Sequence, residues 1–122
     1  MKSVLKVDMS RHNLLIHPDL QIDAAEKTSG PPQRISGLTL GVVDMAQPPP
    51  HGGEMHPDGD EVLYVVSGRI RLIYDNAPDL PMVLAAGDAC IIPAGEWHRL
   101  EVLEPARLIH VTPGPGGDAR PA

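Results

Sequence analysis

The chain has 122 residues, which is the size of one compact domain and leaves little room for a second. Asp and Glu total 16 against 10 Lys and Arg, and this net charge of −6 argues against a nucleic-acid partner, because phosphate binding needs a positive surface. The 12 glycines and 14 prolines argue against long helices, and no apolar run reaches the roughly 18 residues that a membrane-spanning helix needs.

Residues 1–35 show no regular pattern of apolar segments, in contrast to the rest of the chain. Residues 13–17 are followed by Pro18 and predict a short strand that ends there. Residues 23–27 predict one helical turn, and the Ser, Gly and Pro residues at 29–32 predict its end. This part of the chain is therefore expected to be an arm that carries a strand.

From residue 34 onward the chain consists of short apolar segments that turn signals divide. Ser67-Gly68 is expected to be a tight turn, and Glu104-Pro105 is expected to join the last two strands as a hairpin. The tail over 113–122 is rich in Pro and Gly and is expected to be flexible. Short strands with few helical segments predict an all-β sandwich or barrel. The expected strands cover 35–45 (as one strand or two), 61–66, 69–74, 80–84, 90–92, 97–103 and 107–111.

Two imidazoles and two carboxylates stand next to turns in this pattern. An extended backbone would place the side chains of Glu54 and His56 on the same face of a strand. The turn-forming residues 57–60 follow and can fold Glu61 back toward His56. His98 comes just after a Pro/Gly turn, at the start of another strand. If these strands are neighbours, the set suits Fe(II), Mn(II), Ni(II) or Zn(II), with open positions for a substrate or oxygen.

This arrangement resembles the two sequence motifs of the cupin superfamily. The first motif runs G-x5-H-x-H-x3,4-E-x6-G, and residues 48–68 match its intervals, with Pro48 in place of the opening Gly. The second runs G-x5-P-x-G-x2-H-x3-N, and residues 87–102 match its intervals, with Val102 in place of the closing Asn. The resemblance covers roughly residues 36–112. It implies a double-stranded β-helix, the jelly-roll barrel of antiparallel strands, with a metal ion in its mouth.

The resemblance also implies that His56, Glu61 and His98 hold this ion. The first His of the motif pair falls on Glu54 here, and we expect this carboxylate to be the fourth ligand. If Glu54 is not bound to the metal, it is the candidate catalytic residue, a general base near the substrate. A second carboxylate hardens the site and tilts its preference toward Mn(II) or Fe(II). Alternatively, His51 swings in across two flexible glycines and restores three imidazoles.

Alternation along the strands assigns faces to the neighbours of these predicted ligands. Leu63 and Leu100 share a face with them and are expected to line an apolar pocket, together with Val65 and Val102. Tyr64 is out of phase and is expected to face away from the mouth. His110 alternates with Thr112 further along the chain, but the pattern assigns it no face, so it is kept as a candidate for supporting a ligand.

These features predict a mononuclear metal-binding protein that acts on a small organic molecule by dioxygenase, isomerase or lyase chemistry. The alternative is a non-catalytic module that binds or senses a small molecule. Cupins commonly dimerise, by packing sheets or exchanging an N-terminal strand, so we expect a homodimer with residues 1–35 as the arm. The single Cys90 cannot form a disulfide within the chain, and the N-terminus lacks an unbroken apolar stretch. The expected location is therefore the cytoplasm, with no membrane partner.

Overall fold

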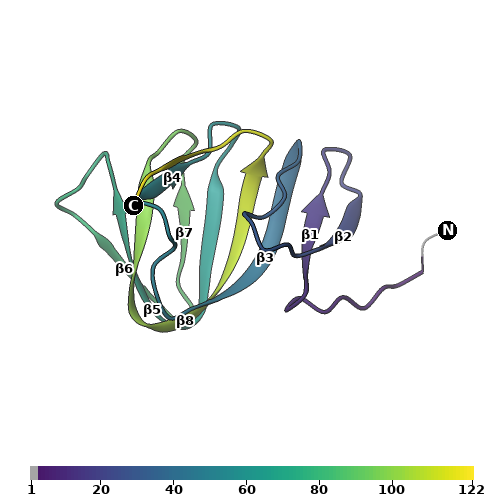
Figure 1. Ribbon diagram of the computed structural model, residues 1–122, viewed down its shortest axis with the longest axis horizontal. Helices are drawn as coiled ribbons and strands as arrows, with labels where there is room; N and C mark the ends of the chain where they lie inside the picture. The colour runs from purple at the N-terminus through teal and green to yellow at the C-terminus, as the bar shows by residue number, and fades with distance from the viewer. Residues whose placement is uncertain (1–2) are drawn as a thin grey trace.

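The computed structural model describes residues 3–122 and leaves the first two residues of the arm outside the described range. Every regular element in this range is a β-strand, and none of the described residues belongs to a helix that could cross a membrane. Figure 1 shows the strands as a curved layer, with β1 and β2 at one side and β6 at the other. The strands are β1 (His12–Ile16), β2 (Ile22–Glu26), β3 (Gly37–Met45), β4 (Gly53–Met55), β5 (Glu61–Tyr74), β6 (Met82–Ala85), β7 (Ala89–Ile92), β8 (His98–Gly114) and β9 (Asp118–Arg120).

All strand pairings in the described range are antiparallel, so the predicted all-β antiparallel fold is confirmed. The hydrogen-bonded order is β2-β1-β3-β8-β4-β9, and β5 pairs with β6, β7 and β8. The predicted strand over 35–45 is confirmed as the single strand β3, which pairs with the second half of β8. The two longest strands, β5 and β8, therefore form the centre of the sheet.

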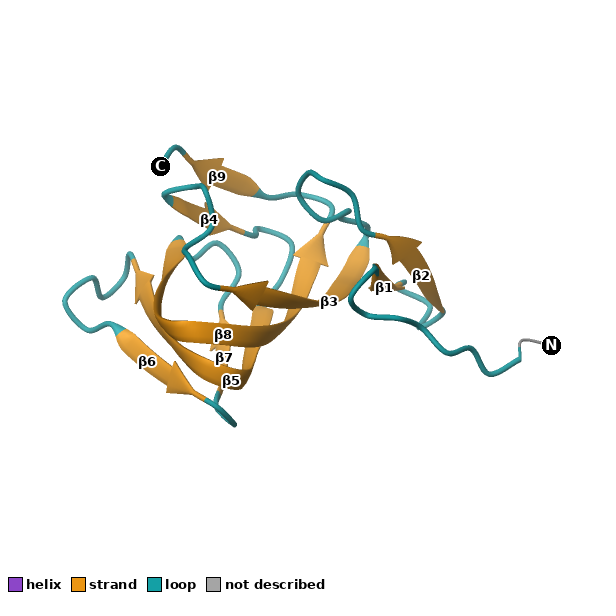
Figure 2. Ribbon diagram, turned by 60° about the horizontal axis from the view of Figure 1, so that its bottom comes forward, coloured by secondary structure: helices purple, strands orange, loops and turns teal. Residues whose placement is uncertain are grey.

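The β5–β8 ladder is bent. It extends from Val62 opposite Val111 to Tyr74 opposite His98, which would span about 40 Å if it were straight at about 3.3 Å per residue. The register shifts between Val65 and Ile70, and such irregularities bend a strand pair and increase its twist. Figure 2 shows β5 and β8 curving together, so that the sheet wraps around an interior.

The turns expected at Ser67-Gly68 and Glu104-Pro105 are wrong, because β5 and β8 continue through both positions. Gly68 has a φ of 82°, and a Cβ atom there would lie 2.6 Å from the Cα of Ala106. Glycine thus allows the two bent strands to approach closely at a bulge. Proline is tolerated at 105 because the broken register needs no backbone donor there. Both segments bend the chain without reversing it.

The helical turn expected over 23–27 is also wrong, because residues 22–26 form β2. This strand pairs with β1, with His12 opposite Glu26. A five-residue segment gains little from helix propensity, whereas a partner strand satisfies its backbone groups at once. β1 also pairs with β3, with Leu14 opposite Leu40, so the arm extends the sheet of its own chain.

The tail contributes β9, a strand that the sequence analysis did not predict. It pairs with β4, with Ala119 opposite Glu54. The guanidinium of Arg120 lies 4.1 Å from the ring centroid of Trp97 and forms a 2.7 Å ion pair with Asp75. The tail thus pairs with the edge of β4 and packs against Trp97.

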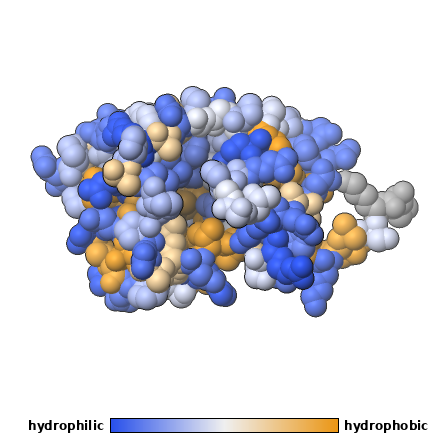
Figure 3. Space-filling view, viewed as in Figure 1, coloured by the Kyte–Doolittle hydropathy of each residue, from blue (hydrophilic) through white to orange (hydrophobic). Residues whose placement is uncertain are grey.

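The interior of the curved sheet is aliphatic, as a chain without Phe requires. Leu63, Val65 and Leu100 are buried as the alternation predicts, whereas Tyr64 is 37% exposed. Hydrophilic residues dominate the face of the molecule shown in Figure 3, and hydrophobic residues are visible on it in separate patches. The buried cluster comprises Leu63, Val65, Ile70, Leu72, Leu84, Cys90, Ile92, Leu100, Ala106 and Leu108.

Candidate metal centre

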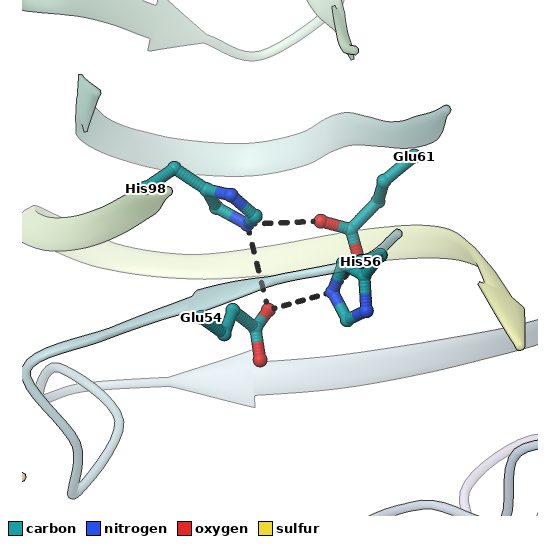
Figure 4. Close-up of side chains that lie close together, drawn as sticks. All are labelled: Glu54, His56, Glu61 and His98. Carbon is teal, nitrogen blue, oxygen red and sulfur yellow. Dashed lines mark ion pairs between the residues drawn. The ribbon is translucent and has the colours of Figure 1, made fainter. Parts of the chain in front are cut away.

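Four side chains that the sequence analysis singled out lie together at one end of the sheet. Each of Glu54, His56, Glu61 and His98 offers one ligand atom, and these atoms lie within 4.8 Å of one another. We call them the four-residue cluster. Glu54 lies in β4, directly opposite His98 at the start of β8, and Glu61 begins β5. Figure 4 shows the two carboxylates and the two imidazoles pointing toward one another.

Two loops hold the matching motifs against each other. The backbone carbonyl of His56 accepts a hydrogen bond from the amide of Gly95 (2.9 Å). The carboxylate of Asp60 accepts one from the amide of Ala94 (2.9 Å). These bonds link the turn after His56 to the Pro/Gly turn before His98. Segments that are far apart in the sequence are therefore fixed side by side.

The distances within the four-residue cluster suit a single shared ion. His98 Nε2 lies 3.1 Å from Glu61 Oε1 and 3.6 Å from Glu54 Oε1. His56 Nε2 lies 3.5 Å from Glu54 Oε1 and 3.5 Å from Glu61 Oε2. Donors bound at about 2.1 Å to one ion are separated by about 3.0 Å at a right angle and about 3.4 Å at a tetrahedral angle. The donor set thus has the spacing of a coordination sphere.

The hydrogen bonding of the cluster also fits a metal ion. His56, Glu61 and His98 are buried, yet the Nε2 atoms of both imidazoles and Oε1 of Glu61 have no hydrogen-bond partner. One unpartnered buried polar atom costs about 1–3 kcal/mol, and an ion would satisfy all three. The Nδ1–H group of His98 donates to the carbonyl of Glu96 (3.0 Å), so in the neutral form of this ring the lone pair lies on Nε2. This ring is therefore oriented as a ligand.

The cluster attracts positive charge. Burial would raise the pKa of Glu54, but contacts with His56 and His98 outweigh it and hold this pKa well below its usual range. Burial would lower the pKa of His98, but contacts with Glu54 and Glu61 outweigh it and raise this pKa to about 10. The two carboxylates thus favour a cation between them, carried either by His98 or by a metal ion.

Glu61 is held in place by two buried residues behind it. The hydroxyl of Thr112 donates to Glu61 Oε2 (2.6 Å). The same hydroxyl oxygen, Oγ1 of Thr112, lies 2.9 Å from Nδ1 of His110. Because the hydroxyl has a single hydrogen, it must accept from His110, which places the ring proton on Nδ1. Burial, together with the charge of Arg34, lowers the pKa of His110 to about 4, so this ring is neutral. His110 thus supports Glu61 through Thr112. The sequence analysis did not single out Thr112, although its position two residues after His110 in the same strand could have identified it.

An inner cavity of about 140 Å³ adjoins the cluster. Glu54, Glu61 and His98 line its polar side, and aliphatic residues that include Leu63 and Leu100 line the other. Val65 and Val102, which were expected here, are not part of this lining. A second pocket of about 780 Å³ adjoins the inner cavity and shares four lining residues with it. The four shared residues are Arg34, Pro49, His51 and Glu54.

His51 lies beside the cluster and outside it. Its Nε2 atom is 3.6 Å from Glu54 Oε2, and its Nδ1 atom accepts a hydrogen bond from the amide of Gly53 (3.2 Å). Of the two alternatives from the sequence, the structure brings Glu54 into the group of potential ligands. Arg34, which also lines the cavity, was not singled out, because it precedes the first matched motif and no sequence spacing marks it.

Comparison with known proteins agrees with this fold. A family model described as the cupin domain matches residues 44–112, and the chain belongs to the cupin family. A cupin-2 domain protein from Shewanella frigidimarina has a similar structure, with a TM-score of 0.56 and 21% identity over 74% of this chain and 85% of that one. A cupin superfamily protein from Desulfitobacterium hafniense has a TM-score of 0.52 and 17% identity over 62% of this chain and 65% of that one.

A third similar structure is that of HppE with iron(II) and its substrate. Its TM-score is 0.50, with 25% identity over 62% of this chain and 45% of that one. The chain therefore spans less than two thirds of HppE and of the Desulfitobacterium protein. No curated protein matches the sequence.

Proposed function

We propose that this cupin binds one divalent metal ion through the four-residue cluster and that a small organic molecule reaches this ion in the inner cavity. The observation that carries the proposal is the group of buried ligand atoms without hydrogen-bond partners, all within 4.8 Å of one another. The 140 Å³ cavity next to them has room only for a small molecule.

The donor set of two imidazoles and two carboxylates suits Mn(II) or Fe(II) best, with Ni(II) and Zn(II) as the other candidates. Four protein ligands in an octahedral sphere leave two open positions. HppE, at 25% identity, has been determined with iron(II) and with cobalt(II), each in complex with substrate. This similarity supports a site for a first-row divalent ion that also receives a small molecule.

We propose dioxygenase, isomerase or lyase chemistry at this site. When bound, the ion supplies a Lewis acid and adjacent positions for chelating oxygen atoms. Thr112 and His110 hold Glu61 in one orientation, and the aliphatic wall around Leu63 excludes water from one side of the cavity. If Glu54 is not a ligand, its carboxylate, which lines the cavity, can accept a proton from the bound molecule.

We further propose that the curved sheet is a jelly-roll barrel over residues 36–112, with the cluster at its mouth. The bent β5–β8 ladder and the membership of the cupin family support this architecture. The residues before 36 and after 112 would then be additions to the barrel, although β1 and β9 pair with its strands.

The test is the metal content of the purified protein after dialysis against Mn(II) or Fe(II). We expect one equivalent in the wild type and none in the double variant His56→Ala/His98→Ala. The matched control is His12→Ala/His17→Ala, because both of these histidines lie in the arm and outside the cluster. Full metal content in the first double variant would contradict the site. Metal binding without activity on any chelating diketone, enediol or sugar would instead favour a binding or sensing module.

A further inference from the structure

Arg34 brings a half-buried positive charge to the inner cavity. Its side chain lines both the inner cavity and the adjoining pocket. The Nη1 atom of its guanidinium is buried and has no hydrogen-bond partner. A buried charged donor without a partner is costly, so its presence calls for an explanation. The proposed metal site gives none, because Arg34 is a cation and cannot be a ligand.

The backbone around Arg34 is fixed by the fold. The hydroxyl of Thr39, a fully buried residue of β3, donates to the carbonyl of Gln33 (2.8 Å). On the other side, a Cβ atom at Gly114 would lie 2.6 Å from the carbonyl oxygen of Ile35 and 2.9 Å from Cβ of Arg34. Glycine at the end of β8 therefore makes room for this segment. Arg34 thus projects from a built part of the structure.

The charges around the cavity leave Arg34 uncompensated once a metal is bound. Burial lowers the pKa of Arg34, but the charges of Glu54 and Glu61 oppose this effect, and an arginine stays protonated in proteins. A divalent ion would neutralise these two carboxylates. Arg99, the other arginine of the lining, has a side chain that is 46% exposed and lies 3.7 Å from a carboxylate oxygen of Glu101. Arg34 is therefore the cation that is available to a ligand.

We propose that Arg34 binds the carboxylate end of a small organic acid whose other oxygen atoms reach the metal in the four-residue cluster. This inference rests on the proposed function and names its substrate class. A guanidinium offers a planar fork of N–H donors that matches a carboxylate, and the bond is strongest where water is excluded. The cavity of about 140 Å³ limits the acid to a few carbon atoms.

The experiment is a calorimetric titration of the Mn(II)-loaded protein with oxalate, malonate and succinate, each in turn. These three acids span a range of distances between two carboxylates. The variants are Arg34→Gln, which removes the charge, and Arg34→Lys, which keeps the charge without the fork. Arg99→Gln is the matched control. It also removes an arginine from the lining of the cavity, but Arg99 already lies close to the carboxylate of Glu101. A titration with Mn(II) alone reports whether each variant is folded. A titration of the loaded protein with imidazole, a neutral metal ligand, reports whether the open positions on the metal are intact.

We expect at least one dicarboxylate to bind the wild type and to lose about tenfold or more of its affinity in Arg34→Gln, with a smaller loss in Arg34→Lys. Affinities for Mn(II) and imidazole should stay within about twofold, as should every affinity of Arg99→Gln. The inference is overturned if no dicarboxylate binds, or if Arg34→Gln and Arg99→Gln have equal effects. If the wild type does not bind Mn(II), the proposed function itself fails, and the inference fails with it. If Arg34→Gln does not bind Mn(II), the dicarboxylate affinities of Arg34→Lys and Arg99→Gln are compared instead. Equal effects of these two variants then overturn the inference.

Discussion

Glu61 and His98 lie at opposite ends of the longest strand pair, yet their Oε1 and Nε2 atoms are 3.1 Å apart. Glu61 precedes the pair formed by Val62 and Val111, and His98 pairs with Tyr74 at the other end. A straight ladder of this length would separate the two by about 40 Å. The bend of β5 and β8 therefore creates the candidate metal centre.

The bend depends on Gly68, so replacing this residue should weaken both the fold and the site. In Gly68→Ala, the new Cβ would meet the backbone of Pro105 and Ala106 at a φ of 82°. The control is Gly87→Ala, which has a φ of 94° and nothing within 4 Å of the new Cβ. Both variants carry the cost of a left-handed alanine, but only the first also clashes. We expect Gly68→Ala to be less stable than the control by about 1–3 kcal/mol in urea unfolding. Equal stability would show that the close approach is not needed.

The hydrogen bond from Thr112 to Glu61 should contribute to metal affinity. Thr112→Val keeps the shape of the side chain but removes the hydroxyl that donates at 2.6 Å, so Glu61 is no longer held in one orientation. We expect the affinity for Mn(II) to fall by about tenfold or more in an isothermal titration. Thr28→Val, at an exposed position of the arm, is the control and should bind like the wild type. An unchanged affinity in Thr112→Val would mean that Glu61 does not need this support.

Metal binding should release a proton from His98. The pKa of this residue is raised to about 10 by Glu54 and Glu61 against the opposing effect of burial, so the ring is protonated at pH 7 before the metal binds. A metal needs the neutral ring, so its apparent affinity should rise with pH up to about 10. Calorimetry in buffers of different ionisation enthalpy should show about one proton released per ion at pH 7. His110, with a pKa lowered to about 4, adds none. An affinity that does not change between pH 7 and 9 would contradict this interpretation.

We expect the chain to form a homodimer through the outer face of β5 and β7. Tyr64, Val66 and Ile91 expose apolar side chains there, and Ile91 is 71% exposed opposite Val62. Ile91→Lys should shift the mass measured by light scattering from two chains to one. The control is Leu80→Lys, a 70% exposed position in the loop before β6. A wild type that is monomeric at micromolar concentration would refute the dimer.

The sequence predicted the strands well, because apolar residues separated by turn signals have few other ways to be buried. It failed where the chain bends within a strand, since a Ser-Gly or Glu-Pro pair marks a tight turn and a bulge alike. Register decides between the two, and register depends on the partner strand. The segment over 22–26 failed for the same reason, because pairing with β1 outweighs its weak local preference.

The site was predictable in part. The spacing of Glu54, His56, Glu61 and His98 marked all four members of the cluster, because the matched motifs place them at fixed intervals. Arg34 was not predictable, because only the wrapping of the sheet brings its segment over the cavity. Such a residue can be identified as a candidate ligand-binding residue only from the structure, which shows where its charge lies.

The most direct test is a crystal structure of the Mn(II)-soaked protein with an anomalous difference map at the manganese edge. We predict one peak at about 2.0–2.3 Å from a ligand atom of each of Glu54, His56, Glu61 and His98. A peak bound elsewhere, or two imidazoles that both point away from it, would contradict the claim that the bent sheet assembles a single metal site.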